Sequence, residues 1–264
     1  MRRNSSTEVP LDDSARPPLR GIVVAIPARD EAPSIGLALS LILCALQDLP
    51  ASMSTVMCVA CDSCVDGTVA EVGRTPDHGT DVLIVEGVWQ SVGGARRAAV
   101  QHGLDSLLSA GLRLEQIWIA TTDADTTVGP DWLSRQLRYA EIGLDAVAGI
   151  VDLRRDADLT IATEEIFGDM YKVPRHGHSH VHGANLGVRA DAYVVAGGFP
   201  ILSASEDREL WNSLLASGYR CHASNRLRVS TSARLHGRVE EGFAFALRKR
   251  QGNVDGLTLE LSRT

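Results

Sequence analysis

The sequence predicts an α/β fold, a single Rossmann-like domain with a mostly parallel central sheet and helices on both faces. The first observation is that short β-branched runs alternate with helical segments of about ten to fifteen residues, as in right-handed βαβ crossovers. The second is a hydrophobic share of 44%, which is that of an ordinary globular core. The third is the lack of any repeat or composition change that would divide the chain.

The individual elements follow in order from residue 21, where the β-branched run "GIVVAIPA" begins. Strands are predicted at residues 21–28, 54–60, 81–87, 116–125 and 145–153. Helices are predicted at residues 34–46, where Pro33 stands in the first turn, in the segment after residue 68, at residues 92–111, and at residues 130–143, which Pro130 opens. Residues 1–19 are polar and proline-rich, so a disordered tail is expected there, followed by one domain at residues 20–264.

Charge and cysteine usage exclude several classes of protein. The formal net charge is -7 and no stripe of Lys or Arg is present, so nucleic acid is a poor partner. Five cysteines, an odd number, without an N-terminal apolar run indicate the reducing cytoplasm. The longest apolar stretch, residues 34–46, is shorter than the roughly 20 residues that cross a bilayer. We therefore expect a cytoplasmic protein without a transmembrane segment.

Two carboxylates, Asp123 and Asp125, follow the predicted strand at residues 116–125 with a spacing of two. In open parallel sheets, ligands bind beyond the carboxyl ends of the strands, where residues 27–31 and Asp62 also fall. Mg²⁺ or Mn²⁺ accepts one or two carboxylates together with diphosphate oxygens, and such an ion would remove the repulsion between the aspartates. Since no cationic residue is near in the sequence, removing one charge is expected to stabilise the metal-free protein.

Asp-Ala-Asp and five further segments resemble the inverting family 2 glycosyltransferases of the GT-A fold. In chain order the further segments are "VVAIPARDEAPSI", "VACDSCVDGT", "GGARRAAVQHGL", "GANLGVRADAYVVAGGFP" and "SEDRELWNSLLASGYR". The resemblance covers about residues 21–250. It implies a single GT-A domain that transfers a sugar, a hexose, from a nucleotide diphosphate sugar to an acceptor hydroxyl with inversion.

The resemblance also implies a role for individual residues. Asp207 would be the catalytic base, with Glu206 as the paired acid. The Mg²⁺ or Mn²⁺ ion would be held by Asp125, Asp123 and His236, with Arg234 and Arg238 beside the leaving diphosphate. Donor binding is assigned to Pro27, Arg29, Glu31, Asp62, Gly94, Arg97, Asp123 and Ala124.

Several of these residues have a structural alternative. Asp62 could cap the helix that follows it, and Glu206 with Asp207 could complement a helix dipole. Of the adjacent Arg96 and Arg97, one must point away from the nucleotide or the acidic cluster. Glycines 93 and 94 would permit close approach of the backbone to the ligand, although glycines are common in turns before helices.

Histidine and cysteine runs leave other functions open. His176, His178, His180 and His182 would share one face of a strand, as a polar acceptor-facing edge or a metal site. Cysteines 58, 61 and 64 resemble an iron–sulfur run that lacks its fourth cysteine. The alternatives are therefore a non-enzymatic His/Cys metal module and a sugar nucleotidyltransferase, although no glycine-rich loop follows the first strand. A retaining mechanism also stays open, as does the acceptor, a small molecule or a lipid-linked one reached by peripheral membrane contact.

Overall fold

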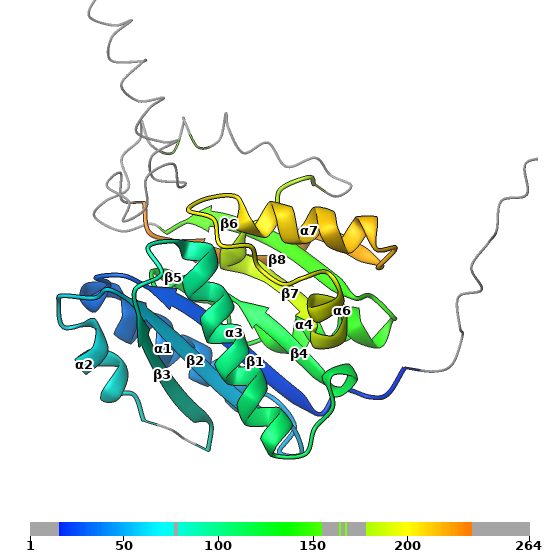
Figure 1. Ribbon diagram of the computed structural model, residues 1–264, viewed down its shortest axis with the longest axis horizontal. Coiled ribbons are helices and arrows are strands. Elements are labelled where there is room, and N and C mark those ends of the chain that lie inside the picture. The colour runs from blue at the N-terminus through cyan, green and yellow to red at the C-terminus, as the bar shows by residue number, and fades with distance from the viewer. Residues whose placement is uncertain (1–15, 77–78, 155–163, 165–166, 168–177, 234–264) are drawn as a thin grey trace, which may run out of the picture.

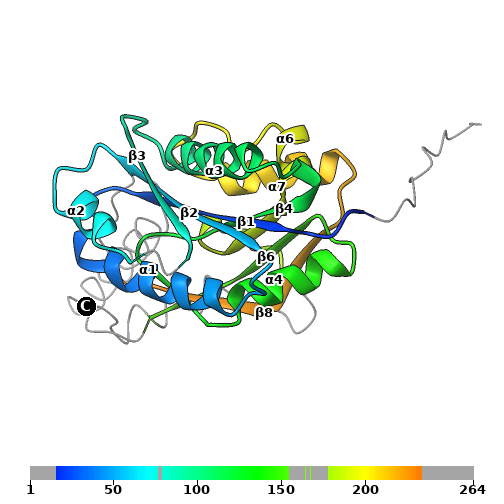
Figure 2. The same ribbon diagram turned by 90° about the horizontal axis from the view of Figure 1, so that it is seen from below.

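A computed structural model describes residues 16–76, 79–154, 164, 167 and 178–233. Within these residues one eight-stranded sheet has the order β3-β2-β1-β4-β7-β6-β8-β5 and carries helices on both faces (Figures 1 and 2). Residues 1–15 of the expected tail lie outside the described residues, whereas Arg16 forms an ion pair with the buried Asp145.

The first half of the chain alternates strand and helix as predicted. Its elements are β1 (Gly21–Ala28), α1 (Ala32–Gln47), β2 (Ser54–Asp62), α2 (Thr68–Gly73), β3 (Asp81–Gly87), α3 (Val92–Ser109), the short 3-10 helix η1 (Leu114–Gln116) and β4 (Ile117–Thr121). β3, β2, β1 and β4 are parallel neighbours. The predicted parallel sheet with helical crossovers is therefore confirmed for this half.

The second half mixes strand directions. Its elements are β5 (Thr126–Val128), α4 (Trp132–Glu141), β6 (Ala146–Leu153), η2 (Gly183–Asn185), β7 (Leu186–Arg189), α6 (Ala190–Val195), α7 (Glu206–Ala216) and β8 (Cys221–Thr231). β7 lies antiparallel between β4 and β6, and β8 runs parallel to β6 and antiparallel to β5. The sequence did not predict β5, β7 or β8, because β5 and β7 have only three and four residues, and β8 is rich in polar residues and is interrupted by a bulge opposite β6.

Two hydrophobic clusters fill the space on either side of the sheet. On β1, Ile22, Val24 and Ile26 pack into the cluster that includes α1 and α4. Val23 and Ala25 alternate with them and join the opposite cluster, which includes α3, α6 and α7. Since every residue of β1 is buried, the strand reads as a continuous apolar run, as expected for a sheet covered on both faces. Figure 2 shows the two helical layers edge-on.

The predicted strand at residues 116–125 ends early, at Thr121. The backbone N–H of Thr126 donates to the carbonyl of Asp123 at 3.1 Å, which turns the chain into β5. Asp123 and Asp125 therefore lie in a turn between two strands, at the carboxyl end of β4. Because β7 runs antiparallel to β4 and starts directly after η2, η2 lies at the same edge of the sheet.

Candidate active site

The turn after β4 holds its two aspartates differently. Asp123 keeps 36% of its side chain exposed. Asp125 is buried, and its Oδ1 accepts a hydrogen bond from Thr231 Oγ1 of β8 at 3.2 Å. Ala124 between them packs into the core below the turn. The turn is thus anchored on β8 and presents the Asp123 carboxylate toward solvent.

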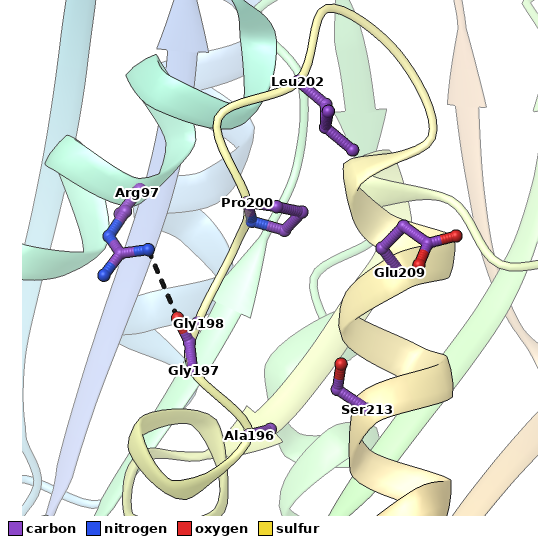
Figure 3. A pocket seen from close by; sticks show the side chains of 8 residues that line it. All are labelled: Arg97, Ala196, Gly197, Gly198, Pro200, Leu202, Glu209 and Ser213. Atoms are coloured by element: carbon purple, nitrogen blue, oxygen red, sulfur yellow. Dashed lines mark hydrogen bonds between the residues drawn. The ribbon is translucent and has the colours of Figure 1, made fainter.

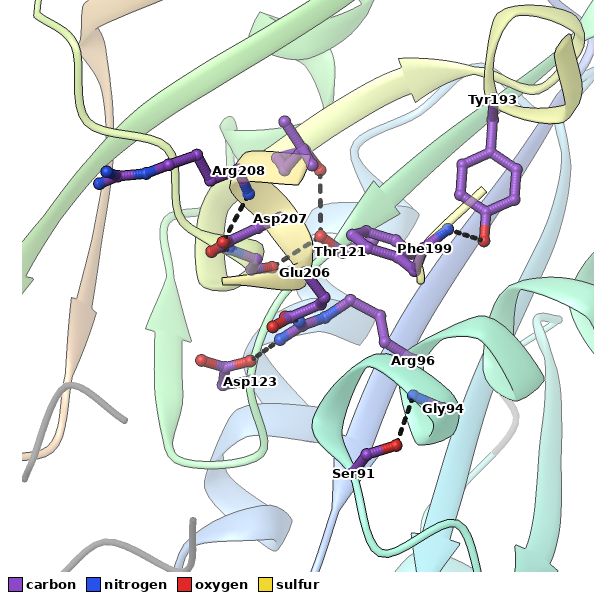
Figure 4. A network of polar contacts seen from close by, with 12 residues as sticks. Ser91, Gly94, Arg96, Thr121, Asp123, Tyr193, Phe199, Glu206, Asp207 and Arg208 are labelled. Carbon is purple, nitrogen blue, oxygen red and sulfur yellow. Dashed lines mark hydrogen bonds and ion pairs between the residues drawn. The ribbon is translucent and has the colours of Figure 1, made fainter. Parts of the chain in front are cut away.

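A buried arginine of α3 joins this turn to α7. The Arg96 side chain is 2% exposed, and its Nη2 donates to Asp123 Oδ1 at 2.6 Å. Its Nη1 donates to Glu206 Oε1, and the guanidinium carbon lies 5.5 Å from the centre of the Phe199 ring (Figure 4). No cationic residue is near Asp123 in the sequence, but the fold brings one from 27 residues earlier in the chain, so the premise for a gain of stability on removing this charge is wrong.

The first turn of α7 carries the two acids that the sequence singled out. Glu206 is buried in its pair with Arg96, whereas Asp207 is half-buried. The two carboxylate oxygens of Asp207 accept the backbone N–H groups of Gly183 and Arg208, each at 2.7 Å. Both acids lie at the N-terminus of a helix, where their charge is favourable. Of the two, Asp207 is the one that an external group could reach.

Gly183 in η2 connects these groups. Its carbonyl accepts a hydrogen bond from Thr121 Oγ1 at 2.6 Å, while its N–H is bound to Asp207. A Cβ atom at this position would lie 2.4 Å from the guanidinium carbon of Arg96. Only glycine therefore fits here without displacing Arg96, and this is the reason for glycine at the start of "GAN".

Asp62 ends β2 and fastens it to the segment after β3. Its Oδ1 accepts the backbone N–H groups of Trp89 at 2.8 Å and Gln90 at 3.1 Å. Helix α2 instead begins at Gly67 without a side-chain cap, and the N–H of Thr68 is bound by Asp66. The alternative that Asp62 caps the following helix is therefore wrong. The nucleotide contact of Asp62 stays a prediction.

The loop after β1 is fixed to the loop after β2. Asp30 Oδ1 accepts the N–H groups of Val65 and Asp66, and the N–H of Glu31 donates to a threonine hydroxyl at the start of α2, 2.7 Å away. Pro27 and Glu31 are buried, whereas Arg29 is exposed at the same edge. The assignment of Pro27, Arg29 and Glu31 to donor binding is a prediction that these contacts leave untested.

Four non-glycine residues of the described chain have positive φ, and all four lie in loops at this edge. They are Asp30 (53°), Ser63 (55°), Gln90 (51°) and Ser205 (64°). The first three follow β1, β2 and β3, and Ser205 directly precedes Glu206. A non-glycine residue in this conformation costs energy, and such residues concentrate at functional sites. Their distribution is consistent with a binding site at the carboxyl edge of the sheet.

Arg97 points away from the acidic cluster. Its Nη1 donates to the carbonyls of Gly197 and Phe199, both at 3.2 Å, and it lines a cavity of about 420 Å³ between α3 and α7 (Figure 3). Of the two adjacent arginines, Arg96 is therefore the one that binds the acidic cluster. The donor contact assigned to Arg97 remains a prediction.

The space beside the two glycines that open α3 is filled by other residues of the protein. A Cβ atom on Gly93 would lie 2.1 Å from the carbonyl oxygen of Pro200, and one on Gly94 would lie 2.7 Å from Ser91 Oγ. Ser91 caps α3 by accepting the N–H of Gly94 at 3.1 Å. Close packing and capping therefore explain these glycines in full, and the assignment of Gly94 to donor binding is untested.

The described part of the histidine run, residues 178–182, is not in a strand, and its last member, His182, lies beside Asp207. The rings of His178 and His180 stack with centroids 5.9 Å apart, and those of His180 and His182 lie 6.1 Å apart. Burial lowers the pKa of His182 to about 4, against the opposing charges of Asp207 and Asp123. His182 is therefore neutral in the folded protein at neutral pH. His176, His236, Arg234 and Arg238 lie outside the described residues.

The low pKa of His182 predicts a loss of stability in mild acid. The unfolded chain takes up a proton below about 6.5 while the folded protein stays neutral to about pH 4, so the stability that this residue contributes above pH 6.5 is lost across that interval. The loss is on the order of 3 kcal/mol. Denaturation titrations between these pH values should show a flatter profile for His182→Asn than for wild type. The same substitution at the exposed His102 is the control, and an equal slope in both variants would contradict the prediction.

The cysteine run consists of thiols that are hard to ionise in the metal-free protein. Burial raises the pKa of Cys58 and Cys61 to about 12, and that of Cys64 is also raised mainly by burial. Metals bind the thiolate, which these thiols form only with difficulty. No group of three or more His, Cys, Asp or Glu residues in the described chain is arranged to hold a metal by itself. Within the same residues, no helix has the length and hydrophobicity to cross a membrane.

The fold and the site define the class of protein. The sheet and the helices on its two faces have the fold of glycosyltransferases of the GT-A type. Residues 23–195 match the family "Glycosyl transferase family 2". The chain therefore belongs to this family. A search of curated proteins finds no significant match.

Solved structures share the fold at low sequence identity. The mannosyltransferase PcManGT from Pyrobaculum calidifontis, in complex with GDP-Man and Mn²⁺, is 20% identical with a TM-score of 0.56, covering 84% of this chain and 58% of that one. S. aureus TarS 1-349 in complex with UDP is 14% identical with a TM-score of 0.57, covering 80% of this chain and 60% of that one. GalNAc-T7 with UDP, GalNAc and Mn²⁺ is 11% identical with a TM-score of 0.56, covering 81% and 44%. This chain thus spans less than two thirds of each.

Proposed function

We propose that the protein transfers a sugar from a nucleotide diphosphate sugar to an acceptor hydroxyl. The observation that carries the proposal is the meeting of Asp123 and the first turn of α7 across Arg96, at the carboxyl edge of the sheet. Family membership and neighbours solved with GDP-Man, UDP and Mn²⁺ support it. The donor lies over the ends of β1, β2 and β4, within reach of Asp62 and Arg29.

A divalent cation fits the chemistry of the turn after β4. Asp123 offers a partly exposed carboxylate, and Asp125 lies two residues on. Hard oxygen ligands of this kind suit Mg²⁺ or Mn²⁺, which complete their shell with waters and phosphate oxygens. The ion would be held by Asp123 and Asp125, with His236 as a further candidate ligand, and when bound it would neutralise the leaving diphosphate. No group of three or more His, Cys, Asp or Glu among the described residues could hold a metal ion, so waters and phosphate oxygens would have to complete the shell.

Asp207 is the group proposed to take the proton from the acceptor hydroxyl. Its two backbone hydrogen bonds fix the carboxylate without a side-chain cation, and its partial exposure leaves it open to an acceptor. The acceptor oxygen attacks the anomeric carbon as Asp207 removes its proton, and the diphosphate leaves with the bonding electrons. A direct displacement of this kind inverts the anomeric centre. Glu206, through its pair with Arg96, holds in place the first turn of α7 that carries Asp207.

The donor is identified by thermal denaturation of the full chain with nucleotide sugars, with and without Mn²⁺. A donor that binds only the folded state raises the apparent stability by mass action, so a specific sugar nucleotide should raise the melting temperature more with Mn²⁺ than without it. UDP, GDP and the matching free sugars separate recognition of the base from recognition of the sugar. If no nucleotide sugar stabilises the protein under either condition, the proposed function is wrong.

A further inference from the structure

Arg96 is a buried cation that takes no direct part in the proposed reaction. The side chain is 2% exposed, and its two terminal nitrogens bind acids from two different elements. Its Nε has no hydrogen-bond partner among the described residues. Burying a guanidinium is costly unless its charge is paired or its N–H groups are hydrogen-bonded, and for Arg96 both described partners are acids. The arrangement therefore depends on both Asp123 and Glu206.

The surroundings of Arg96 close it off from direct contact with a substrate. The Phe199 ring lies against the guanidinium, 5.5 Å from centroid to Cζ, and the Cα of Gly183 approaches it so closely that a Cβ would clash. What Arg96 does reach is one partly exposed carboxylate of the turn after β4 and the buried acid beside Asp207. An effect on the reaction must therefore pass through these two acids.

We propose, on the basis of the proposed function, that Arg96 is a positioning residue that couples the cation site to the base. Through Asp123 it holds the turn after β4, and through Glu206 it holds the first turn of α7, which carries Asp207 (Figure 4). In the metal-free protein it neutralises the acids, and it gives up Asp123 when a divalent cation binds there. The base is thereby aligned with the donor that the cation accompanies.

Arg96 and a divalent cation compete for Asp123, so removing the charge of Arg96 and removing the charge of Glu206 should change the affinity for a cation in opposite directions. Removing the charge of Arg96 leaves its acids uncompensated, so the metal-free protein loses stability while its affinity for a cation rises. Removing the charge of Glu206 leaves Asp123 as the remaining charged partner of Arg96 in this pair of acids. Arg96 then binds Asp123 more strongly, and the affinity of Asp123 for a cation falls. A coupling between two ligands of one group is typically worth about fivefold or more in affinity. A merely structural arginine would change stability without changing the response to a cation.

The test measures thermal denaturation of the full chain with Mn²⁺ alone as the probe. Compared with wild type, Arg96→Met should gain more stability from Mn²⁺, corresponding to about fivefold tighter binding or more, and Glu206→Gln should gain less. Arg96→Lys keeps the charge but engages only one acid well, because an ammonium lacks the planar fork, so it should fall between Arg96→Met and wild type. Gly183→Ala displaces the guanidinium without removing a charge and should shift in the direction of Arg96→Met.

Arg189 provides the matched control. It is 4% exposed, like Arg96, but donates to the backbone carbonyls of Glu115 and Ala140 away from the site. Arg189→Met should lose stability and keep the wild-type response to Mn²⁺. If Arg96→Met and Arg96→Lys respond to Mn²⁺ as wild type does, or more weakly, the proposal is overturned.

A double-mutant cycle without metal separates this proposal from the proposed function. The cost of Asp123→Asn to stability should be smaller in the Arg96→Lys background than in wild type, because the pair is already weakened there. Equal costs in both backgrounds would overturn the coupling. If wild type does not respond to Mn²⁺ at all, the metal dependence in the proposed function fails and the release of Asp123 fails with it, while the cycle still decides whether Arg96 couples the two elements.

Discussion

Replacing Asp207 by asparagine is expected to lower the turnover of sugar transfer by about 10²–10⁴-fold, the usual contribution of a general base. Donor affinity should stay close to wild type, because a base acts when the acceptor hydroxyl attacks and contributes little to donor binding. Asparagine keeps an oxygen that can accept the N–H of Gly183, so the fold should survive. The measurements are steady-state transfer and donor binding on the same preparation.

Two variants of the same helix turn serve as comparisons for Asp207→Asn. Glu209→Gln removes a first-turn acid that is exposed and outside the site, and it should leave turnover near wild type. Glu206→Gln should reduce turnover less than Asp207→Asn does, through the pair with Arg96. Near-normal transfer by Asp207→Asn would remove this residue from the role of base. Loss of transfer together with donor binding would assign it a structural role.

Asp123→Asn is expected to abolish the dependence of donor binding on Mn²⁺ and to destabilise the metal-free protein as well. The second effect follows from the lost negative charge beside a buried guanidinium: an amide oxygen can still accept from Arg96, but the hydrogen bond is no longer between two charged groups, a difference on the order of 1–3 kcal/mol. Asp125→Asn should also abolish the metal dependence, but it should cost less stability because an amide oxygen can still accept from Thr231. Titration with donor, with and without Mn²⁺, and denaturation without metal are the measurements.

A surface pair gives the control for the loss of charge. Asp131 pairs with Arg135 on the exposed face of α4, and Asp131→Asn should cost only about 0.3–0.5 kcal/mol with unchanged donor binding. If Asp123→Asn and Asp125→Asn bind donor with the wild-type dependence on Mn²⁺, this turn does not hold the cation. A rise in metal-free stability of Asp123→Asn would show that its pair with Arg96 is not formed.

The strands of the first half of the sheet could be predicted because each is a compact β-branched or apolar run, whether it is buried throughout, as β1 is, or lies at the edge of the sheet, as β3 does. β1 and β3 have the predicted bounds, 21–28 and 81–87, since a continuous β-branched run between glycine and polar residues has no competing interpretation. β7 and β8 could not be predicted in this way. "LGVR" is too short to show a period, and β8 is rich in polar residues and is interrupted by a bulge opposite β6, where Gly149 pairs with Ser224 and Ile150 with Arg228.

The candidate acids were found from sequence because strand ends and helix starts are local features. Asp123, Asp125, Glu206 and Asp207 stand directly after an apolar run or at the head of a periodic one. The sequence did not single out Gly183, whose signal is only that glycine opens "GAN". Nor could it distinguish Arg96 from Arg97, because adjacent residues on a helix differ only in direction, and the direction depends on what α3 packs against.

The sequence by itself determined the fold class and placed the candidate acids at the carboxyl edge of the sheet, where ligand binding is a prediction, since both follow from hydrophobic periodicity and from where it stops. Only the tertiary structure decided which charges meet. Arg96 and Glu206 are separated by 110 residues in the chain, yet the guanidinium of one is bound to the carboxylate of the other. The physical reason is that a buried charge is costly unless it is paired or hydrogen-bonded, and for Arg96 the paired acid is supplied by the packing of α3 and α7 on the same face of the sheet.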